Sequence, residues 1–163
     1  MIIGSGGAGK STLARTLGEK LNINVIHLDV LLWKPNWNQV ARDEQIKIQQ
    51  QIVQDKEWII DGNYGGTMDI RFQEADTIIF LDLPRIICIY RAIKRAIQYR
   101  NKSRPDMVEG NKERLDFNFY KWIWNYPKNR RPEIINKLKE LENEKKIIHL
   151  ESIKETHHYI DNL

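Results

Sequence analysis

A run of glycines close to the start of the chain constrains the fold more than any other feature. Gly4-Ser5-Gly6-Gly7-Ala8-Gly9-Lys10-Ser11 follows the apolar residues 1–3 and precedes a stretch with leucines at 13, 17 and 21. Leucines four residues apart share one helix face, so the run joins a strand to an amphipathic helix. Glycines let consecutive backbone N–H groups turn toward one anion without a Cβ atom in the way. The pattern Gly-x-x-x-x-Gly-Lys-Ser in this context therefore predicts a loop that binds phosphates.

The residues at the end of this loop indicate what accompanies the phosphates. The helix that follows directs its positive end toward the same anion. Lys10 adds a point charge for β and γ phosphates, and the Ser11 hydroxyl is a hard oxygen ligand suited to Mg²⁺. We therefore expect ATP and Mg²⁺ as cofactors. The residues expected to bind the nucleotide phosphates are Gly4, Ser5, Gly6, Gly7, Ala8, Gly9, Lys10, Ser11 and Thr12.

Strand and helix patterns alternate along the rest of the chain. The expected strands are 1–3, 24–28, 58–60, 77–81 and 146–150, and the expected helices are 10–21, 42–56, 84–99, 113–124, 131–144 and 154–163. Such alternation predicts an α/β fold with a five-stranded parallel sheet and helices on both faces, the three-layer P-loop NTPase fold. The length of 163 residues suits a single domain spanning 1–163.

The helix expected at 84–99 has an apolar face and a basic face. Ile86, Tyr90, Ile93 and Ile97 share one side, which we expect to pack on the sheet. Basic residues lie toward the opposite side.

Three expected strands end in carboxylates, at Asp29, Asp61 and Asp82. The carboxyl ends of parallel strands open onto the ligand crevice of such a sheet. Carboxylates there could hold Mg²⁺ or orient an acceptor hydroxyl, or each could cap a turn. We predict a metal site formed by Ser11, Asp61 and Asp82.

Several segments together resemble the adenylate kinase-like P-loop kinases, and more closely the bacterial DNA topology modulation proteins. The resemblance covers nearly the whole chain. It is carried by residues 4–15, Val-Ile-His-Leu-Asp at 25–29, Trp-Ile-Ile-Asp-Gly-Asn-Tyr at 58–64, Ile-Ile-Phe-Leu-Asp-Leu-Pro-Arg at 78–85, Arg-Pro-Asp-Met at 104–107 and Trp-Ile-Trp-Asn-Tyr-Pro at 122–127. The first segment is generic to P-loop kinases, whereas the later ones together are more specific.

The resemblance implies roles for individual residues. Arg91 matches the arginine that stacks on adenine, and Arg95 the one that reaches the phosphates when a lid closes. Asp61 matches the aspartate beside Mg²⁺ and the acceptor. The region 33–57 occupies the acceptor-binding position, and with Asp29 as base or orienter the expected acceptor residues are Asp29, Trp33, Asp61, Asn63, Tyr64 and Arg71.

Two departures from the family bear on the acceptor and the lid. Gly65-Gly66 stands where adenylate kinases carry an arginine, so Arg71 is expected to replace it and AMP is not the predicted acceptor. We expect a short helical lid at 99–112, with Arg104 neutralising charge on the transferred phosphoryl group. Lys10, Asp29, Arg95 and Arg104 are thus the predicted catalytic residues.

Composition leaves a second functional class open. Residues 85–131 hold 13 basic and 4 acidic residues, a local charge of +9 in a chain of net +4. A block of this kind attracts nucleotides, phosphorylated substrates or nucleic acid. It contains aromatic residues that could stack bases or form an ordinary buried helix face. These are Phe117, Phe119, Tyr120, Trp122, Trp124 and Tyr126, flanked by Lys121, Lys128, Arg130 and Arg131.

The predicted function is phosphoryl transfer from ATP–Mg²⁺ to a small-molecule or nucleotide acceptor. A nucleic-acid-associated regulator and a slow NTPase are the alternatives. A single cysteine, Cys88, fits a reducing cytoplasm, and no apolar run approaches the roughly 20 residues that a membrane span needs. His27 and His149 are expected in the core, and His157-His158 have no partner at metal-ligand spacing.

Overall fold

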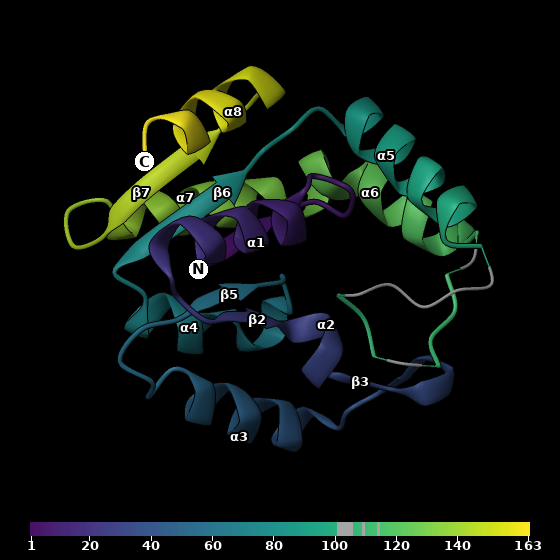
Figure 1. Ribbon diagram of the computed structural model, residues 1–163, viewed down its shortest axis with the longest axis horizontal. Helices are drawn as coiled ribbons and strands as arrows, with labels where there is room; N and C mark the ends of the chain where they lie inside the picture. The colour runs from purple at the N-terminus through teal and green to yellow at the C-terminus, as the bar shows by residue number, and fades with distance from the viewer. Residues whose placement is uncertain (101–105, 109, 114) are drawn as a thin grey trace.

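The computed structural model describes residues 1–100, 106–108, 110–113 and 115–163. Its centre is a five-stranded sheet in the order β2-β5-β1-β6-β7, in which every neighbouring pair is parallel (Figure 1). The strands are β1 (Ile2–Gly4), β2 (Val25–His27), β5 (Ile59–Asp61), β6 (Thr77–Leu81) and β7 (Lys146–Leu150). The predicted α/β fold with a five-stranded parallel sheet is confirmed.

Helices cover both faces of this sheet and connect its strands. They are α1 (Lys10–Leu21), α2 (Leu28–Leu31), α3 (Arg42–Ile52), α4 (Met68–Glu74), α5 (Arg85–Gln98), α6 (Phe117–Asn129), α7 (Arg131–Leu141) and α8 (Ile153–Asp161). A small antiparallel hairpin, β3 (Trp33–Lys34) and β4 (Asn38–Gln39), contains the turn η1 (Pro35–Trp37), and a second turn, η2 (Gly65–Thr67), precedes α4. Neither the hairpin nor α4 was predicted from the sequence.

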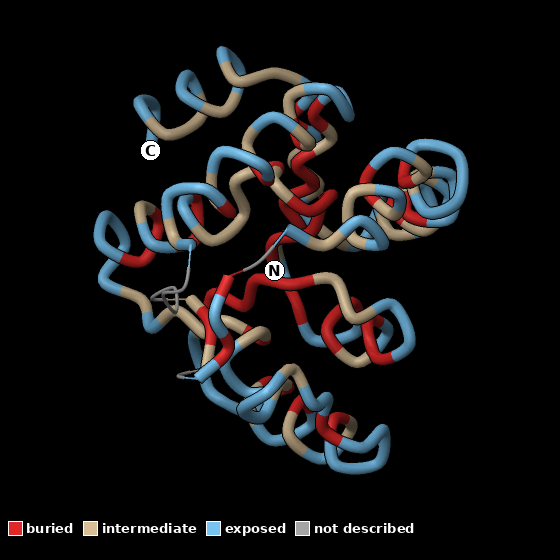
Figure 2. The backbone as a smooth tube through the Cα atoms, turned by 90° about the vertical axis from the view of Figure 1, so that its right-hand side faces the viewer, coloured by how far each residue is buried: buried red, intermediate tan, exposed pale blue. Residues whose placement is uncertain are grey.

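Alternation along the interior strand β6 explains the two main layers. Ile79 and Leu81 pack in one cluster with residues of α1, whereas Ile78 and Phe80 pack in another with residues of α4 and α7. Successive strand residues point to opposite faces, so a fully apolar strand is covered on both sides. Figure 2 shows that buried residues gather at the centre of the molecule, while the outer turns of the helices are exposed.

Helix α6 differs from its prediction at both ends. The Asp116 side chain accepts hydrogen bonds from the backbone N–H groups of Asn118 and Phe119, at 2.9 and 3.2 Å, and so fixes the first turn. The helix therefore begins at Phe117 rather than at residue 113. It continues to Asn129 with Pro127 inside it, so the prediction that it ends near residue 124 was also wrong.

Helix α5 presents the opposite face from the one expected. Pro84 caps the helix rather than starting it, and the residues buried on the body are Cys88, Ala92 and Ala96. The residues expected to pack on the sheet are exposed instead: Ile86 by 70%, Tyr90 by 64%, Ile93 by 38% and Ile97 by 66%. Small side chains allow α5 to lie close to its neighbours, so the apolar stripe of large side chains faces outward.

No helix among the described residues is both long and apolar enough to cross a membrane.

Candidate nucleotide and acceptor site

The loop between β1 and α1 takes the conformation that its glycines permit. Gly7 and Gly9 have φ values of 76° and 103°, in the left-handed region, and Gly9 caps the helix. A Cβ atom at Gly7 would lie 2.1 Å from the Cys88 carbonyl oxygen. Glycine is therefore required at position 7 both by backbone conformation and by the close approach of α5.

Lys10 and Ser11 turn toward the inside of this loop and the sheet edge. Lys10 Nζ donates to the Ser5 carbonyl oxygen at 2.9 Å, which holds the ammonium group over the loop. Burial lowers the pKa of Lys10, and a nearby phosphate would reverse that effect. The Ser11 hydroxyl donates to Asp61 Oδ2 at 2.7 Å, so two of the predicted metal ligands do lie together.

His27 contacts the other oxygen of Asp61. Its Nδ1 lies 2.5 Å from Asp61 Oδ1, and this hydrogen bond raises the pKa of His27. The expectation that His27 belongs to the core was wrong, because the ring lines the cavity at the carboxyl end of β2. Its position at the end of a parallel strand, two residues before Asp29, was the signal that could have identified it.

Asp29 lies on the first turn of α2, beside Tyr64. The Tyr64 hydroxyl donates to Asp29 Oδ1 at 2.7 Å. Burial, followed by the Asp29 charge, raises the pKa of Tyr64, so the phenol keeps its proton and remains a donor. Asp29, Trp33 and Tyr64 all line the cavity.

Asn63 has a second task besides lining the cavity. Its side-chain Oδ1 accepts from Gly4 N at 3.1 Å, and its Nδ2 donates to Gly4 O at 2.8 Å. These two bonds tie the turn after β5 to the start of the phosphate loop. Asn63 therefore sets the distance between the phosphate loop and the end of β5, which carries Asp61.

Arg71 does not reach the cavity, contrary to its prediction as an acceptor-binding residue. It is fully buried, and its guanidinium donates to Gln49 Oε1 at 2.8 Å, to Gly62 O at 2.6 Å and to Asn63 O. Burial lowers the pKa of Arg71 to about 10. The residue supports the Asp61-Gly62-Asn63 turn from behind.

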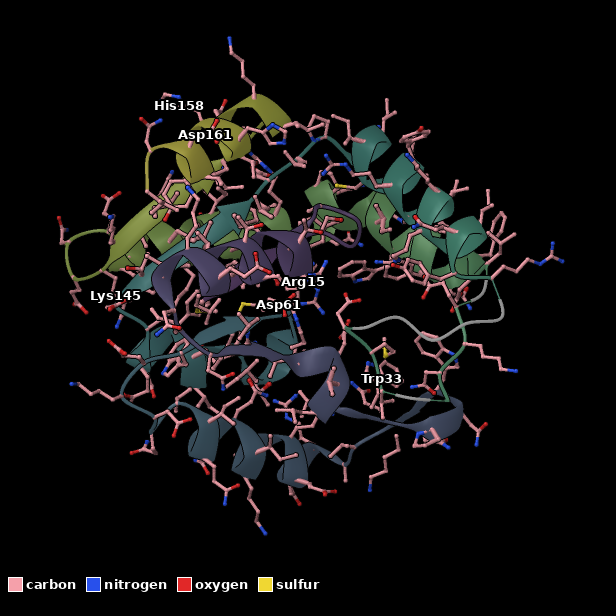
Figure 3. The ribbon with its side chains drawn as sticks, viewed as in Figure 1. Arg15, Trp33, Asp61, Lys145, His158 and Asp161 are labelled. Atoms are coloured by element: carbon pink, nitrogen blue, oxygen red, sulfur yellow. The ribbon has the colours of Figure 1, made fainter. Side chains whose placement is uncertain are left out.

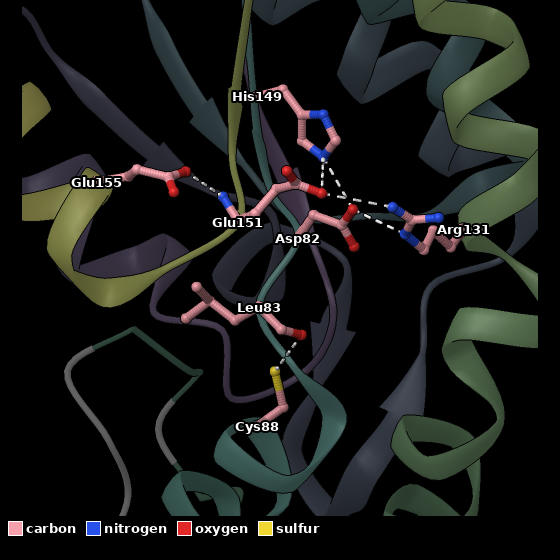
Figure 4. Close-up of polar contacts among 7 residues, drawn as sticks. All are labelled: Asp82, Leu83, Cys88, Arg131, His149, Glu151 and Glu155. Carbon is pink, nitrogen blue, oxygen red and sulfur yellow. Dashed lines mark hydrogen bonds and ion pairs between the residues drawn. The ribbon is translucent and has the colours of Figure 1, made fainter.

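Asp82 does not join Asp61 and Ser11. Its Oδ2 accepts from Arg131 Nε at 2.7 Å and lies 2.8 Å from His149 Nε2, which Figure 4 shows as one group with Glu151. Ligand atoms of Asp82, His149 and Glu151 lie within 4.8 Å of one another. The Arg131 guanidinium pairs with Asp82 and Glu151, so the structure corrects the grouping of Asp82 with the predicted metal ligands and accounts for His149 outside the core.

The predicted arginines have different surroundings. Arg91 Nη1 donates to the Ala8 carbonyl oxygen at 3.2 Å, against the phosphate loop. Arg95 Nε donates to Glu113 Oε1 at 3.0 Å. Both arginines line the cavity. Arg104, with the rest of 101–105 and residue 109 of the expected lid, lies outside the described residues.

One cavity of about 990 Å³ connects these groups. It is lined by residues 6–12 of the phosphate loop, by His27, Asp29 and Asp61, and by Arg91 and Arg95. Figure 3 shows Arg15 and Asp61 at one part of this region and Trp33 at another. The cavity has room for a nucleotide and a second small molecule.

The hairpin that carries Trp33 is fastened to a distant segment by Asn111. Asn111 Oδ1 accepts from Trp37 N at 2.8 Å, and Nδ2 donates to Lys34 O at 3.1 Å. Asn36 and Trp37 have φ values of 64° and 60°, unusual for residues other than glycine. Asn111 was not predicted as part of the site, because nothing in the sequence near residue 111 indicates contact with residues 34–37.

The aromatic run of α6 forms a packed face. Phe119 and Trp122 stack at 6.1 Å between ring centroids, and Trp122 meets Tyr126 edge-on at 5.3 Å. Arg130 pairs with Glu133, and Arg131 pairs with Asp82. The buried-face alternative therefore accounts for Tyr126, whereas Phe119 and Trp122 are only partly buried and also line the cavity.

Comparison with known proteins gives a structural likeness without sequence support. No protein-family model matches the chain, and no curated protein matches it. Among solved structures, shikimate kinase from Bacteroides thetaiotaomicron has a TM-score of 0.54 at 16% identity, over 99% of this chain and 93% of that one. Deoxyadenosine kinase from M. mycoides with bound dATP has a TM-score of 0.55 at 17% identity, over 99% and 96%.

A second shikimate kinase, from Aquifex aeolicus, has a TM-score of 0.53 at 13% identity, over 99% of this chain and 90% of that one. The likeness extends across nearly the full length of each chain. At these identities it establishes architecture and not activity. The chain thus has the fold of the P-loop kinases to which it is similar.

Proposed function

We propose that the protein is an ATP-dependent kinase that transfers the γ-phosphoryl group to a hydroxyl of a small-molecule acceptor. The observation that carries this proposal is the single cavity whose wall includes both the phosphate loop, residues 6–12, and the Asp29–Tyr64 pair. A nucleotide in the loop would present its terminal phosphate toward Asp29. Alignment and charge neutralisation supply most of the catalysis in this reaction class.

The phosphate end of the cavity supplies the charge neutralisation. Backbone N–H groups of the loop, the positive end of α1 and the Lys10 ammonium would bind the β and γ phosphates. Ser11 and Asp61 offer hard oxygens 2.7 Å apart, a donor set that fits Mg²⁺. When bound, the ion would neutralise charge on the phosphate oxygens. Arg91 and Arg95, from α5, add cations to the same end.

The acceptor end supplies the orienting base. Tyr64 donates to one oxygen of Asp29, which fixes the carboxylate and leaves its second oxygen to accept from an acceptor hydroxyl. As that hydroxyl attacks phosphorus, its proton passes to Asp29 and the bond to the ADP oxygen breaks. The likeness to shikimate and deoxyadenosine kinases supports acceptors of the cyclic polyol and nucleoside kinds.

The nucleic-acid alternative receives no comparable support. The two arginines that would hold a nucleic-acid backbone, Arg130 and Arg131, form ion pairs within the protein. We therefore do not propose a role in DNA topology.

A panel of hydroxyl compounds, assayed for ADP release with ATP–Mg²⁺, tests the proposal. We expect one class of acceptor to raise the rate well above the acceptor-free rate. Asp29→Asn should lower that rate by about 10²-fold or more, because it removes the base, and should leave ADP binding unchanged. An equal rate with and without every acceptor would indicate slow ATP hydrolysis and contradict the kinase proposal.

A further inference from the structure

The outward face of α5 carries a stripe of large apolar side chains that are exposed to solvent. Ile86, Tyr90, Ile93 and Ile97 are 38% to 70% exposed, although α5 buries Cys88, Ala92 and Ala96 on its other side. Single exposed apolar residues are common on protein surfaces. Four in a row along one helix are not, and such a stripe marks an interaction surface.

The spacing of the stripe indicates the shape of its partner. The residues follow one another at intervals of four, three and four, the spacing of the seam in a left-handed pair of helices. An interfacial helix that lies on a membrane presents a broader apolar face bordered by cations. The α5 stripe is one residue wide, which fits another helix better than a lipid surface.

Three of the four cations of α5 have partners away from the stripe. Arg85 lies over the Trp124 ring at 3.9 Å, Arg91 binds the phosphate loop and Arg95 pairs with Glu113. Lys94 flanks the stripe. A nearly uncharged seam offers little to an anionic membrane or an acidic partner, and it is complementary to an equally uncharged copy of itself.

We propose that this stripe is the contact between two copies of the chain, with α5 of each copy packed antiparallel about a two-fold axis. With the axis between Tyr90 and Ile93, Tyr90 of one copy meets Ile93 of the other, and Ile86 meets Ile97. In this register Lys94 lies level with the apolar Ile89 of the second copy. The interface is then isologous and closed, the commonest form of homodimer.

The size of the surface predicts a weak dimer. Fourteen residues of helix span about 21 Å, so the two α5 helices alone would cover on the order of 200 Å² each. Stable complexes bury about 800 Å² per partner. The dimer should therefore form at micromolar to millimolar concentration, and the contact would not depend on nucleotide or on the proposed kinase activity.

Sedimentation of the full chain over about 1 to 500 µM tests the proposal, because a weak dimer is populated by mass action. We expect the apparent mass to rise from 19.4 kDa toward twice that value. Tyr90→Glu should weaken association by about tenfold or more, since it places a charge in the seam. Leu21→Glu changes a residue that is 48% exposed at the end of α1, and it should associate as the wild type does.

A mixture of variants tests the register. Ile93→Lys alone should also weaken association, but mixed with Tyr90→Glu it should restore dimers, because the carboxylate introduced in one chain then faces the ammonium group introduced in the other. Thermal unfolding of each variant checks that the chain still folds. A wild type that stays monomeric to the highest concentration, or a Tyr90→Glu chain that associates normally, would overturn the proposal. Failure of the mixture would overturn the antiparallel register, and stripe-dependent binding of a monomer to phosphatidylglycerol vesicles would replace the second copy by a membrane.

Discussion

The two ends of the cavity are built in different ways. The loop at the phosphate end comes from one continuous segment, residues 4–12, and its positive-φ residues, Gly4, Gly7 and Gly9, are all glycines. The acceptor end is assembled from segments that are far apart in the sequence. Besides Gly62 and Gly110, its positive-φ residues include three that are not glycine, Asn36, Trp37 and Tyr64, with φ values of 64°, 60° and 44°.

This difference decides what holds each end in place. Glycine takes positive φ without steric cost, so the bonds from Asn63 and Arg91 to the phosphate loop do not have to offset backbone strain. A non-glycine residue in that region costs on the order of 1 kcal/mol or more, so hydrogen bonds from elsewhere must hold the acceptor end. Substitutions at the phosphate end should then change chemistry, whereas those behind the acceptor end should change stability and positioning.

The largest effect is expected at the phosphate end. Lys10→Ala removes the ammonium group that would neutralise the β and γ phosphates, and ADP release should fall by about 10³-fold. The melting temperature without ligand should stay within a few degrees, because burial of Lys10 as a charged amine does not favour the folded state. Equal losses of activity and stability would remove the contrast between the two ends.

Arg71→Met should produce the next largest effect, which is a loss of stability rather than of chemistry. The substitution leaves Gln49 Oε1 and the carbonyl oxygens of Gly62 and Asn63 without their buried donor. We expect the free energy of unfolding to fall by about 3 kcal/mol in a denaturant titration. Arg130→Met is the control: it breaks an exposed ion pair with Glu133 and should change the free energy of unfolding by less than about 1 kcal/mol.

An alternative outcome would restore the original prediction for Arg71. If Arg71→Met left stability unchanged and raised only the KM for the acceptor, the residue would be an acceptor ligand after all, and the acceptor end would need no support from behind.

The same contrast explains what could be predicted from sequence. The phosphate loop and the alternating strands are local patterns, and the parallel sheet follows from them. The roles of Asp82 and Arg71 depend on partners about 50 and 20 residues away in the chain, at Arg131 and Gln49, which no local pattern identifies. Both were placed in the cavity because of residue type and position at a strand end or after a turn.

Helix α5 shows a second limit of sequence patterns. Hydrophobic spacing located the helix but indicated the wrong buried face, because Cys88, Ala92 and Ala96 form a small-residue face that packs closely. Spacing reports that a helix is amphipathic. It does not report which of two apolar faces meets the body of the protein and which meets a partner.

Asn111→Ala tests the support of the acceptor hairpin, with a smaller effect. It removes the bonds to Trp37 N and Lys34 O, so the hairpin should hold the acceptor less well. We expect the free energy of unfolding to fall by about 1.5 kcal/mol and the KM for the acceptor to rise about tenfold, with ADP affinity unchanged. Asn162→Ala, at the exposed end of α8, is the control and should alter neither value. A matching loss of ADP affinity would show that the two ends are not independent.

His27 lies between the two ends, and its effect should depend on pH. Asp61 raises the pKa of His27 in the folded protein, so the ring binds its proton more tightly in the folded protein than in the unfolded chain. The stability from this pair is fully present below the unfolded value of about 6.5 and is lost as pH rises through the higher folded pKa. In denaturant titrations without Mg²⁺ or nucleotide, the free energy of unfolding of the wild type should exceed that of His27→Gln by about 1 kcal/mol near pH 6. This difference should shrink toward pH 9. His158→Gln, an exposed histidine of α8, should show little difference at either pH. A His27→Gln difference that stays constant across this range would mean that the ring acts by packing, and the Asp61 carboxylate would then be oriented by Ser11 alone.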